Sequence, residues 1–444
     1  MTGTISREES RLKHKSESSF NWRNCWYPVA FLQDLDKSKP YSFSLYNQPF
    51  VIFQDQAGKW GCLADRCSHR AAKLSDGQII DGSIECLYHG WQFDTDGDCQ
   101  RIPQLPEKAT IPRKACVESY RLVEHQGVAW VWPGEASLAD ETKIAAEPHL
   151  NKPGVVCMDT MSDLPFEQTY VIENFLDPAH VVISHDRTEL GAKRENAKPL
   201  ALEISSISAQ GFTGKYTTNL DTNKWGEVEF LAPHIVRYDF GNEVAGVFFG
   251  FALYALPLSP HSTRVLVRRY GNIFPKWFTR RPRWLEHLRQ NKVLEEDLFF
   301  LLAQNQYFEQ SSNSIKKTYL PLKTADVFVM EHRKWLDKYG TELPFYQGYA
   351  TSRKCFSETG FDAVASAKDR LTRHTQLCPT CSRAYRTTER VRQGSIALGI
   401  ALTAVAIVSD TWLECVTVLG ALLSVGIAVV AGQLKRRFEQ AYER

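Results

Sequence analysis

Two short segments that each combine a cysteine with a histidine constrain this chain more than any other feature. Cys67 and His69 lie in the first segment, and Cys86 and His89 follow after sixteen intervening residues. Cysteine thiolates and histidine imidazoles are ligands of zinc and of the irons in iron–sulfur clusters, so these residues fit either kind of site. The chain has 11 cysteines among 444 residues, and an odd number this sparse does not make a disulfide framework. The ligand spacing therefore points to a fold that brings two loops together around metal.

The residues around these segments predict a small all-β domain over 21–134. Short aromatic and β-branched runs alternate with turn signals such as Asp81-Gly82. The second segment continues as His89-Gly90-Trp91, and the whole pattern resembles the Rieske [2Fe–2S] signature of oxygenases. Respiratory Rieske proteins add a further cysteine in each loop, which this chain lacks. The resemblance implies a [2Fe–2S] cluster that relays single electrons and is held by Cys67, His69, Cys86 and His89.

A second group of metal-binding residue types lies between Glu173 and His185. It contains His180, His185, Glu173 and Asp177 among mostly apolar residues. Two imidazoles and one carboxylate form the facial triad that binds non-haem Fe(II) and leaves positions open for dioxygen. The five-residue step from His180 to His185 turns about 140° on a regular helix. Both histidines can therefore face one metal only if the helix is distorted or ends after Pro178.

The third ligand of such a triad must come from another segment. Residues 291–306 have the pattern of a helix, and Asp297 lies on its apolar face. A carboxylate on an apolar face is costly unless it is paired or binds metal, so Asp297 is the expected ligand. The simpler alternative for this acidic cluster is that Glu296 or Glu295 bonds a surface partner.

The spacing Asp177-x-x-His180-x-x-x-x-His185 resembles the mononuclear iron motif of Rieske oxygenases. In that family both histidines bind iron, and the aspartate connects a ligand histidine to the cluster of a neighbouring subunit. The resemblance implies that His180, His185 and Asp297 bind one Fe(II), and that Asp177 links His180 to His89 of the next protomer. It also implies dioxygen as a substrate, ferredoxin or a reductase as electron donor, and a head-to-tail homotrimer.

Strands and helices mix over 155–375, the expected catalytic domain. Alternating apolar residues between Gly211 and Tyr270 predict a large antiparallel sheet with helices before and after it. The predicted fold class is therefore α+β, an all-β Rieske domain followed by a catalytic domain on a helix-grip-like sheet. The first 20 residues are polar and charged without an apolar stretch, which predicts a disordered N-terminus and no secretory signal.

Two apolar runs near the C-terminus predict a transmembrane helical hairpin over 394–434. Asp410 and Glu414 are its only charged residues, and they lie between the runs. Each run is near the lower limit that a bilayer requires, so a hairpin buried in protein is the alternative. A basic linker over 376–393 precedes the hairpin, and a basic tail over 435–444 follows it. By the positive-inside rule both ends then face the same, cytoplasm-like compartment.

The linker contains Cys378-Pro379-Thr380-Cys381, which fits a redox dithiol, half of a zinc site or two incidental thiols. No second cysteine pair exists to complete a zinc site. Its position before the hairpin is similar to the pheophorbide a oxygenase branch of Rieske oxygenases, which includes the chloroplast inner-envelope Rieske translocon component and protochlorophyllide oxygenase-like proteins. That resemblance implies a thylakoid or envelope membrane of a phototroph, and monooxygenation of a chlorophyll-derived tetrapyrrole or its bilin product. It also implies thioredoxin as a reductant of Cys378 and Cys381.

Two other functions are compatible with these motifs. The substrate can instead be a sterol or another membrane lipid, although anchored relatives of that kind usually carry their helix at the N-terminus. A Rieske electron carrier would need no mononuclear iron, and the motif from Asp177 to His185 argues against it. Nucleic acid is not expected as a partner, because 53 Lys and Arg against 51 Asp and Glu leave a net charge of only +2.

Overall fold

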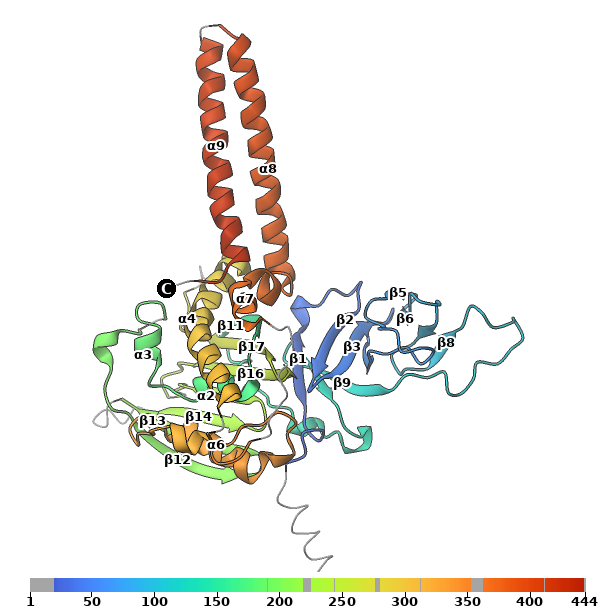
Figure 1. The fold of residues 1–444 in the computed structure, drawn as a ribbon, viewed down its shortest axis with the longest axis vertical. Coiled ribbons are helices and arrows are strands. Elements are labelled where there is room, and N and C mark those ends of the chain that lie inside the picture. The colour runs from blue at the N-terminus through green and yellow to red at the C-terminus, as the bar shows by residue number, and fades with distance from the viewer. Residues whose placement is uncertain are drawn as a thin grey trace, which may run out of the picture. The chain divides into compact units, whose positions relative to one another are not determined.

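The computed structural model describes residues 20–189, 191–218, 225–242, 244–275, 280–311, 313–352, 362–410 and 412–442, drawn as a ribbon in Figure 1. The chain divides into two compact units. The first comprises Met1–Pro275 and Phe300–Phe361, and the second comprises Lys276–Phe299 and Asp362–Arg444. The N-terminal segment predicted to be disordered lies outside the described residues, except for Phe20.

The first unit begins with an all-β region made of two sheets. A six-stranded sheet has the order β1-β10-β9-β4-β3-β2, and a four-stranded sheet has the order β5-β6-β7-β8. The strands are β1 (Tyr27–Phe31), β2 (Tyr41–Leu45), β3 (Gln48–Gln54), β4 (Trp60–Ala64), β5 (Gln78–Ile80), β6 (Ser83–Glu85), β7 (Gln92–Phe93), β8 (Cys99–Arg101), β9 (Ser119–His125) and β10 (Val128–Trp132). Asp81 and Gly82 both have positive φ and form the two-residue turn from β5 to β6, as the Asp-Gly signal predicts. The predicted all-β fold is confirmed.

The rest of the first unit is built on one seven-stranded antiparallel sheet. Its order is β11-β17-β16-β15-β14-β13-β12. The strands are β11 (Val156–Leu164), β12 (Ala201–Ser208), β13 (Gly211–Thr217), β14 (Gly226–Leu231), β15 (Ile235–Asp239), β16 (Phe249–Ser259) and β17 (Ser262–Gly271). Successive strands from β12 to β17 pair with each other, as alternation over this segment predicts. The α+β fold class is confirmed.

The long connection from β11 to β12 crosses from one edge of this sheet to the other. It carries α2 (Gln168–Phe175) and α3 (Val181–Ser184), and so it carries the predicted iron motif. Helix α2 packs on β15, β16 and β17, and α6 (Val327–Lys338) packs on β12 and β13. The remaining short elements of the unit are α5 (Ile315–Thr318), η1 (Leu32–Asp34), η2 (Ala136–Leu138), η3 (Glu141–Lys143), η4 (Arg194–Asn196) and η7 (Gly340–Glu342).

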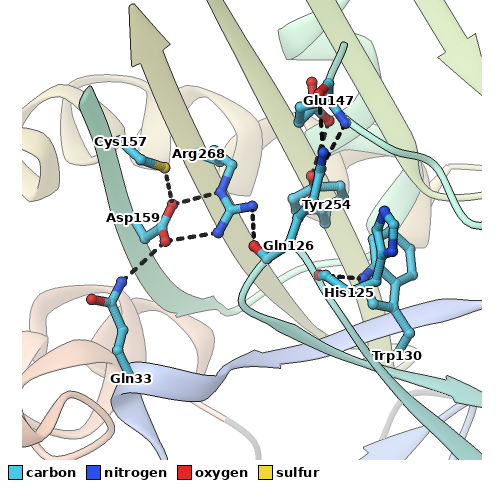
Figure 2. A network of polar contacts seen from close by, with 9 residues as sticks. All are labelled: Gln33, His125, Gln126, Trp130, Glu147, Cys157, Asp159, Tyr254 and Arg268. Atoms are coloured by element: carbon cyan, nitrogen blue, oxygen red, sulfur yellow. Dashed lines mark hydrogen bonds and ion pairs between the residues drawn. The ribbon is translucent and has the colours of Figure 1, made fainter. Parts of the chain in front are cut away.

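A buried polar network ties the all-β region to the seven-stranded sheet (Figure 2). Arg268 on β17 donates to both carboxylate oxygens of Asp159, its register partner on β11, at 2.8 and 2.9 Å. Arg268 also donates to the carbonyl of Gln126 at 2.7 Å, and Gln33 donates to Asp159 at 3.0 Å. Gln33 and Gln126 belong to the all-β region, so these charge-assisted bonds hold it against the sheet.

The second unit is helical. It comprises the first part of α4 (Arg283–Gln310), α7 (Ala363–Lys368), the π-helical turn η8 (Leu371–Thr375), α8 (Pro379–Val408) and α9 (Trp412–Glu439). Helices α8 and α9 lie side by side as a hairpin (Figure 1). Both are long and apolar enough to cross a membrane, by length and composition.

The structure differs from the sequence prediction at the start of this hairpin. Residues 379–393, predicted as part of a basic linker, form the first half of α8, which runs for 30 residues. Pro379 stands in the first turn, where a missing N–H removes no helical bond, and the arginines after it are good helix formers. The basic run is therefore continuous with the apolar helix.

Candidate active site

The two cysteine–histidine segments form loops of the same design, one between β4 and β5 and one between β6 and β7. The N–H of Ala71 donates to the carbonyl of Cys67 at 2.9 Å, and the N–H of Gly90 donates to the carbonyl of Cys86 at 2.8 Å. Ala71 and Gly90 have φ of 57° and 73°, which reverses the chain after each histidine. The loops thus present their ligands in equivalent ways.

The four side chains divide into a buried pair and an accessible pair. Cys67 and Cys86 are 3% and 2% exposed and belong to an apolar cluster of the all-β region. The rings of His69 and His89 lie at the more open side with centroids 4.4 Å apart, and Trp91 stacks on His69 at 4.7 Å. Burial raises the pKa of the Cys67 thiol, so a nearby cation is needed to hold it as a thiolate. Two inner thiolates and two outer imidazoles fit a Rieske cluster.

The predicted break in the iron motif is present. Helix α2 ends at Phe175, His180 immediately precedes α3, and His185 immediately follows it. The ring centroids of His180 and His185 consequently lie 5.3 Å apart. The two imidazoles are thus close enough to share one metal ion, which a regular helix would not allow.

The backbone of Asp177 fixes the tautomer of His180. The Nδ1 atom of His180 lies 2.5 Å from the carbonyl oxygen of Asp177, and because a carbonyl only accepts, Nδ1 carries the proton. Nε2 is then left with its lone pair, as in metal-bound histidines whose other nitrogen donates to a carbonyl. The Asp177 carboxylate accepts from the N–H of Ala179 at 2.8 Å and lies 3.8 Å from Nδ1. Burial raises the pKa of the Asp177 carboxyl.

Asp297 lies on α4, in the part of that helix that belongs to the second unit, and its side chain is buried. A buried carboxylate is costly unless it is paired or binds metal, and one carboxylate with two imidazoles is the donor set of a mononuclear ferrous ion. The alternative for Glu295 is wrong: its partners are not at the surface but are the buried Arg370 and Arg373.

The other acid of the iron motif has a structural partner. Arg333 on α6 donates from Nε to Glu173 at 2.7 Å and from Nη1 to the hydroxyl of Thr169 at 3.1 Å. Arg333 is fully buried, and Glu173 and Thr169 both belong to α2. This pair therefore fixes α2, the helix that leads into the motif, and occupies the carboxylate of Glu173.

Two histidines that the sequence analysis did not identify lie beside the Cys-x-x-Cys pair. His287 and His374 place their rings beside Cys378 and Cys381, and all four residues are buried. The hydrogen bond from Cys381 and the neighbouring imidazoles of His287 and His374 hold the pKa of the Cys378 thiol well below its usual range. His374 stands four residues before Cys378, which is a weak signal, and His287 is about ninety residues away with no signal at all.

Comparison with known proteins agrees with this geometry. Residues 25–121 match the Rieske [2Fe-2S] domain, and residues 230–314 match pheophorbide a oxygenase. Protein TIC 55 of Arabidopsis thaliana is 34% identical over 91% of this chain and 80% of its own length. Pheophorbide a oxygenase of Oryza sativa is 31% identical over 95% of this chain and 84% of its own length. A crystal structure of dicamba monooxygenase shares the fold, with a TM-score of 0.60 over 71% of this chain and 96% of that one at 19% identity.

The fold, the two motifs and these relatives define a Rieske non-haem iron oxygenase, and the chain belongs to that family. Its relatives place it in the branch that contains TIC 55 and pheophorbide a oxygenase. It is a monooxygenase with a Rieske [2Fe–2S] cluster and a mononuclear iron, and members of the family use dioxygen and electrons from ferredoxin or a reductase. The predicted family, activity class and cofactors are confirmed.

Proposed function

We propose that this chain monooxygenates a hydrophobic chlorophyll-derived tetrapyrrole, such as pheophorbide a, a chlorophyllide or a bilin product. The observation that carries the proposal is the match of residues 230–314 to pheophorbide a oxygenase. Chlorophyllide a oxygenase of Arabidopsis thaliana adds support, with 31% identity over 73% of this chain and 59% of its own length. Flavonoid 8-hydroxylase 2 of Ocimum basilicum is 27% identical over 90% of this chain, so flavonoids are the alternative substrate class to test.

We assign the cluster to Cys67, His69, Cys86 and His89, and the mononuclear iron to His180, His185 and Asp297. When bound, the cluster supplies single electrons and the ferrous iron supplies the activation of dioxygen. The chain's own residues orient the site: Asp177 fixes the tautomer of His180 through its carbonyl, and Arg333 immobilises α2. Trp91 packs flat on His69 and holds that ring in place.

Electrons are proposed to pass between the subunits of a head-to-tail trimer. His69 is exposed and His89 is partly exposed, so the histidine side of the cluster is accessible to another protein surface. Asp177 is also partly exposed and lies beside His180. In the trimer the partner subunit's His89 would face Asp177, and the electron would continue from Asp177 to His180.

The Asp177→Asn variant tests this path. We expect both metals to remain bound, because asparagine keeps the backbone carbonyl that bonds His180. Loss of the carboxylate should slow electron transfer from the cluster to the iron at least roughly 10-fold, the lower end of what groups around a metal ligand contribute. Single-turnover reoxidation of the cluster measures that rate. Glu203→Gln, an exposed acid on β12, is the control, and an unchanged rate in Asp177→Asn would refute the path.

The hairpin is proposed to anchor the enzyme in a thylakoid or envelope membrane, with the rest of the chain on the stromal or cytoplasmic side. Basic residues flank the apolar stretch at both ends, in the first half of α8 and at Lys435, Arg436 and Arg437 of α9. TIC 55 and the pheophorbide a oxygenases are chloroplast proteins. Thioredoxin, the implied reductant of Cys378 and Cys381, would have to reach two sulfurs that are both buried.

The substrate is tested with purified full-length chain in detergent, ferredoxin with its reductase, and ¹⁸O₂. The panel contains pheophorbide a, chlorophyllides, bilins, sterols and flavonoids. We expect substrate-dependent oxygen uptake and one ¹⁸O atom in a tetrapyrrole or bilin product. Labelling of a sterol or a flavonoid alone would overturn the substrate class. If no compound of the panel stimulates oxygen uptake, the proposed function is overturned.

A further inference from the structure

Four buried metal-binding side chains meet in the second unit, apart from the residues assigned to oxygenation. His287 is on α4, His374 is in the π-helical turn η8, Cys378 is the N-cap of α8 and Cys381 lies in its first turn. None of the four is more than 2% exposed. The N–H of Cys378 donates to the carbonyl of His374 at 2.9 Å, so the backbone itself holds three of the four close together. Departures from α-helical geometry such as η8 are frequent at functional sites.

The spacing of the four ligand atoms fits one tetrahedral ion. Each lies within 4.8 Å of the other three. His287 Nδ1 is 3.4 Å from both sulfurs, and His374 Nε2 is 3.3 Å from the sulfur of Cys381. Zinc–sulfur and zinc–nitrogen bonds of about 2.3 and 2.05 Å at tetrahedral angles give a sulfur–nitrogen edge of roughly 3.6 Å. The observed edges are only slightly shorter than that.

The types of ligand in this cluster indicate which metal ion it binds. Two thiolates and two imidazoles form a common structural zinc set, and four protein ligands leave no open position for a reaction. Two thiolates also neutralise the two charges of Zn²⁺, so the occupied site adds no net charge to its surroundings. This matters because Phe438, Trp284 and Leu288 pack around the pair of cysteines.

We propose that His287, His374, Cys378 and Cys381 bind a structural zinc ion that fastens the start of the hairpin to α4. The inference does not depend on the substrate or on the oxygenation chemistry. His287 and Asp297 are ten residues apart on α4, about 15 Å along the helix axis. The ion therefore anchors the same helix that supplies the third ligand assigned to the mononuclear iron.

The zinc site replaces the prediction of a redox dithiol. A reductant must reach one sulfur of a disulfide in line, and both sulfurs here are almost inaccessible to solvent. Cys378 and Cys381 are also not bridged to each other in the structure. Bound to zinc, they would stay reduced and would not exchange with an external thiol.

The test is the zinc content of full-length protein purified in detergent without chelators. We expect about one zinc per chain beside the iron of the two catalytic centres. The double variant Cys378→Ser/Cys381→Ser and the single variant His374→Ala should lose it. His374→Cys, which restores a four-ligand set, should retain it, and Cys415→Ser, an exposed thiol on α9, is the matched control.

A second measurement uses only the wild-type chain, so its result does not depend on whether the variants fold. Cobalt introduced in place of zinc into the wild-type chain should give the visible absorption of tetrahedral Co²⁺ with thiolate ligands. Wild-type protein that contains no zinc, or a Cys378–Cys381 disulfide, would overturn the proposal. Zinc that persists in the double variant would overturn it as well. None of these results would alter the oxygenation assay of the wild-type chain.

Discussion

Replacing Asp297 with alanine should abolish oxygenation while leaving the Rieske cluster intact. The carboxylate is the third ligand that we assign to the mononuclear iron beside His180 and His185, so the variant removes one of three protein ligands. Outer partners of ligands are already worth about 10–100-fold in metal affinity, so loss of a ligand should lower turnover at least about 100-fold. Iron should fall from about three to about two per chain, while acid-labile sulfide and the spectrum of the reduced cluster stay constant.

Glu296→Ala is the matched control for this experiment. It removes a carboxylate of equal burial one residue earlier on the same helix, outside the assigned ligand set. Iron content and turnover should therefore stay close to those of the wild type. The opposite pattern, with iron lost from Glu296→Ala and kept in Asp297→Ala, would move the third ligand to Glu296 and contradict the assignment.

Replacing Arg268 with methionine should destabilise the first unit by about 3–5 kcal/mol, the usual result of removing one partner of a buried ion pair. Asp159, which is buried, would lose both charge-assisted hydrogen bonds from the guanidinium. The bond from Arg268 to the carbonyl of Gln126, which ties the all-β region to the sheet, would also be lost. Thermal unfolding followed by the visible spectrum of the cluster should show a midpoint lower by roughly 5 °C or more.

The control for this variant is Lys59→Met. Lys59 pairs with Asp96 at 2.8 Å, but the two side chains are 55% and 71% exposed. An exposed pair is worth at most about 1 kcal/mol, so the midpoint should hardly change. Equal effects of the two variants would mean that the buried network does not hold the all-β region in place.

Much of the fold could be predicted because its signals are local. The alternation of apolar residues between Gly211 and Tyr270 defines strands that pair with their neighbours in sequence, and the Asp81-Gly82 turn defines a hairpin. The break between Phe175 and Val181 also followed from geometry, because five residues on a helix place two imidazoles on different sides. The bounds of that break could not be placed, since they depend on the contacts of α2 with the sheet and with Arg333.

The remaining features depend on contacts between distant parts of the chain. No local pattern connects His287 with Cys378, so the sequence showed two cysteines where the structure shows four possible ligands. Glu295 looked like a surface acid, because its partners Arg370 and Arg373 lie more than seventy residues away. The basic run before the hairpin was mistaken for a linker, because charge alone does not distinguish an exposed helix from a loop.

The unbroken course of α8 limits how the protein moves in its proposed membrane. The fifteen residues before Gly394 extend about 22 Å as a helix, well beyond the headgroup layer of a bilayer. A continuous helix has no flexible loop between its basic and apolar halves, so the end that carries Cys378 is held at a fixed height above the lipid. Any tilt of the apolar half in the lipid would be transmitted to the Cys378 end, because the two halves form one continuous helix.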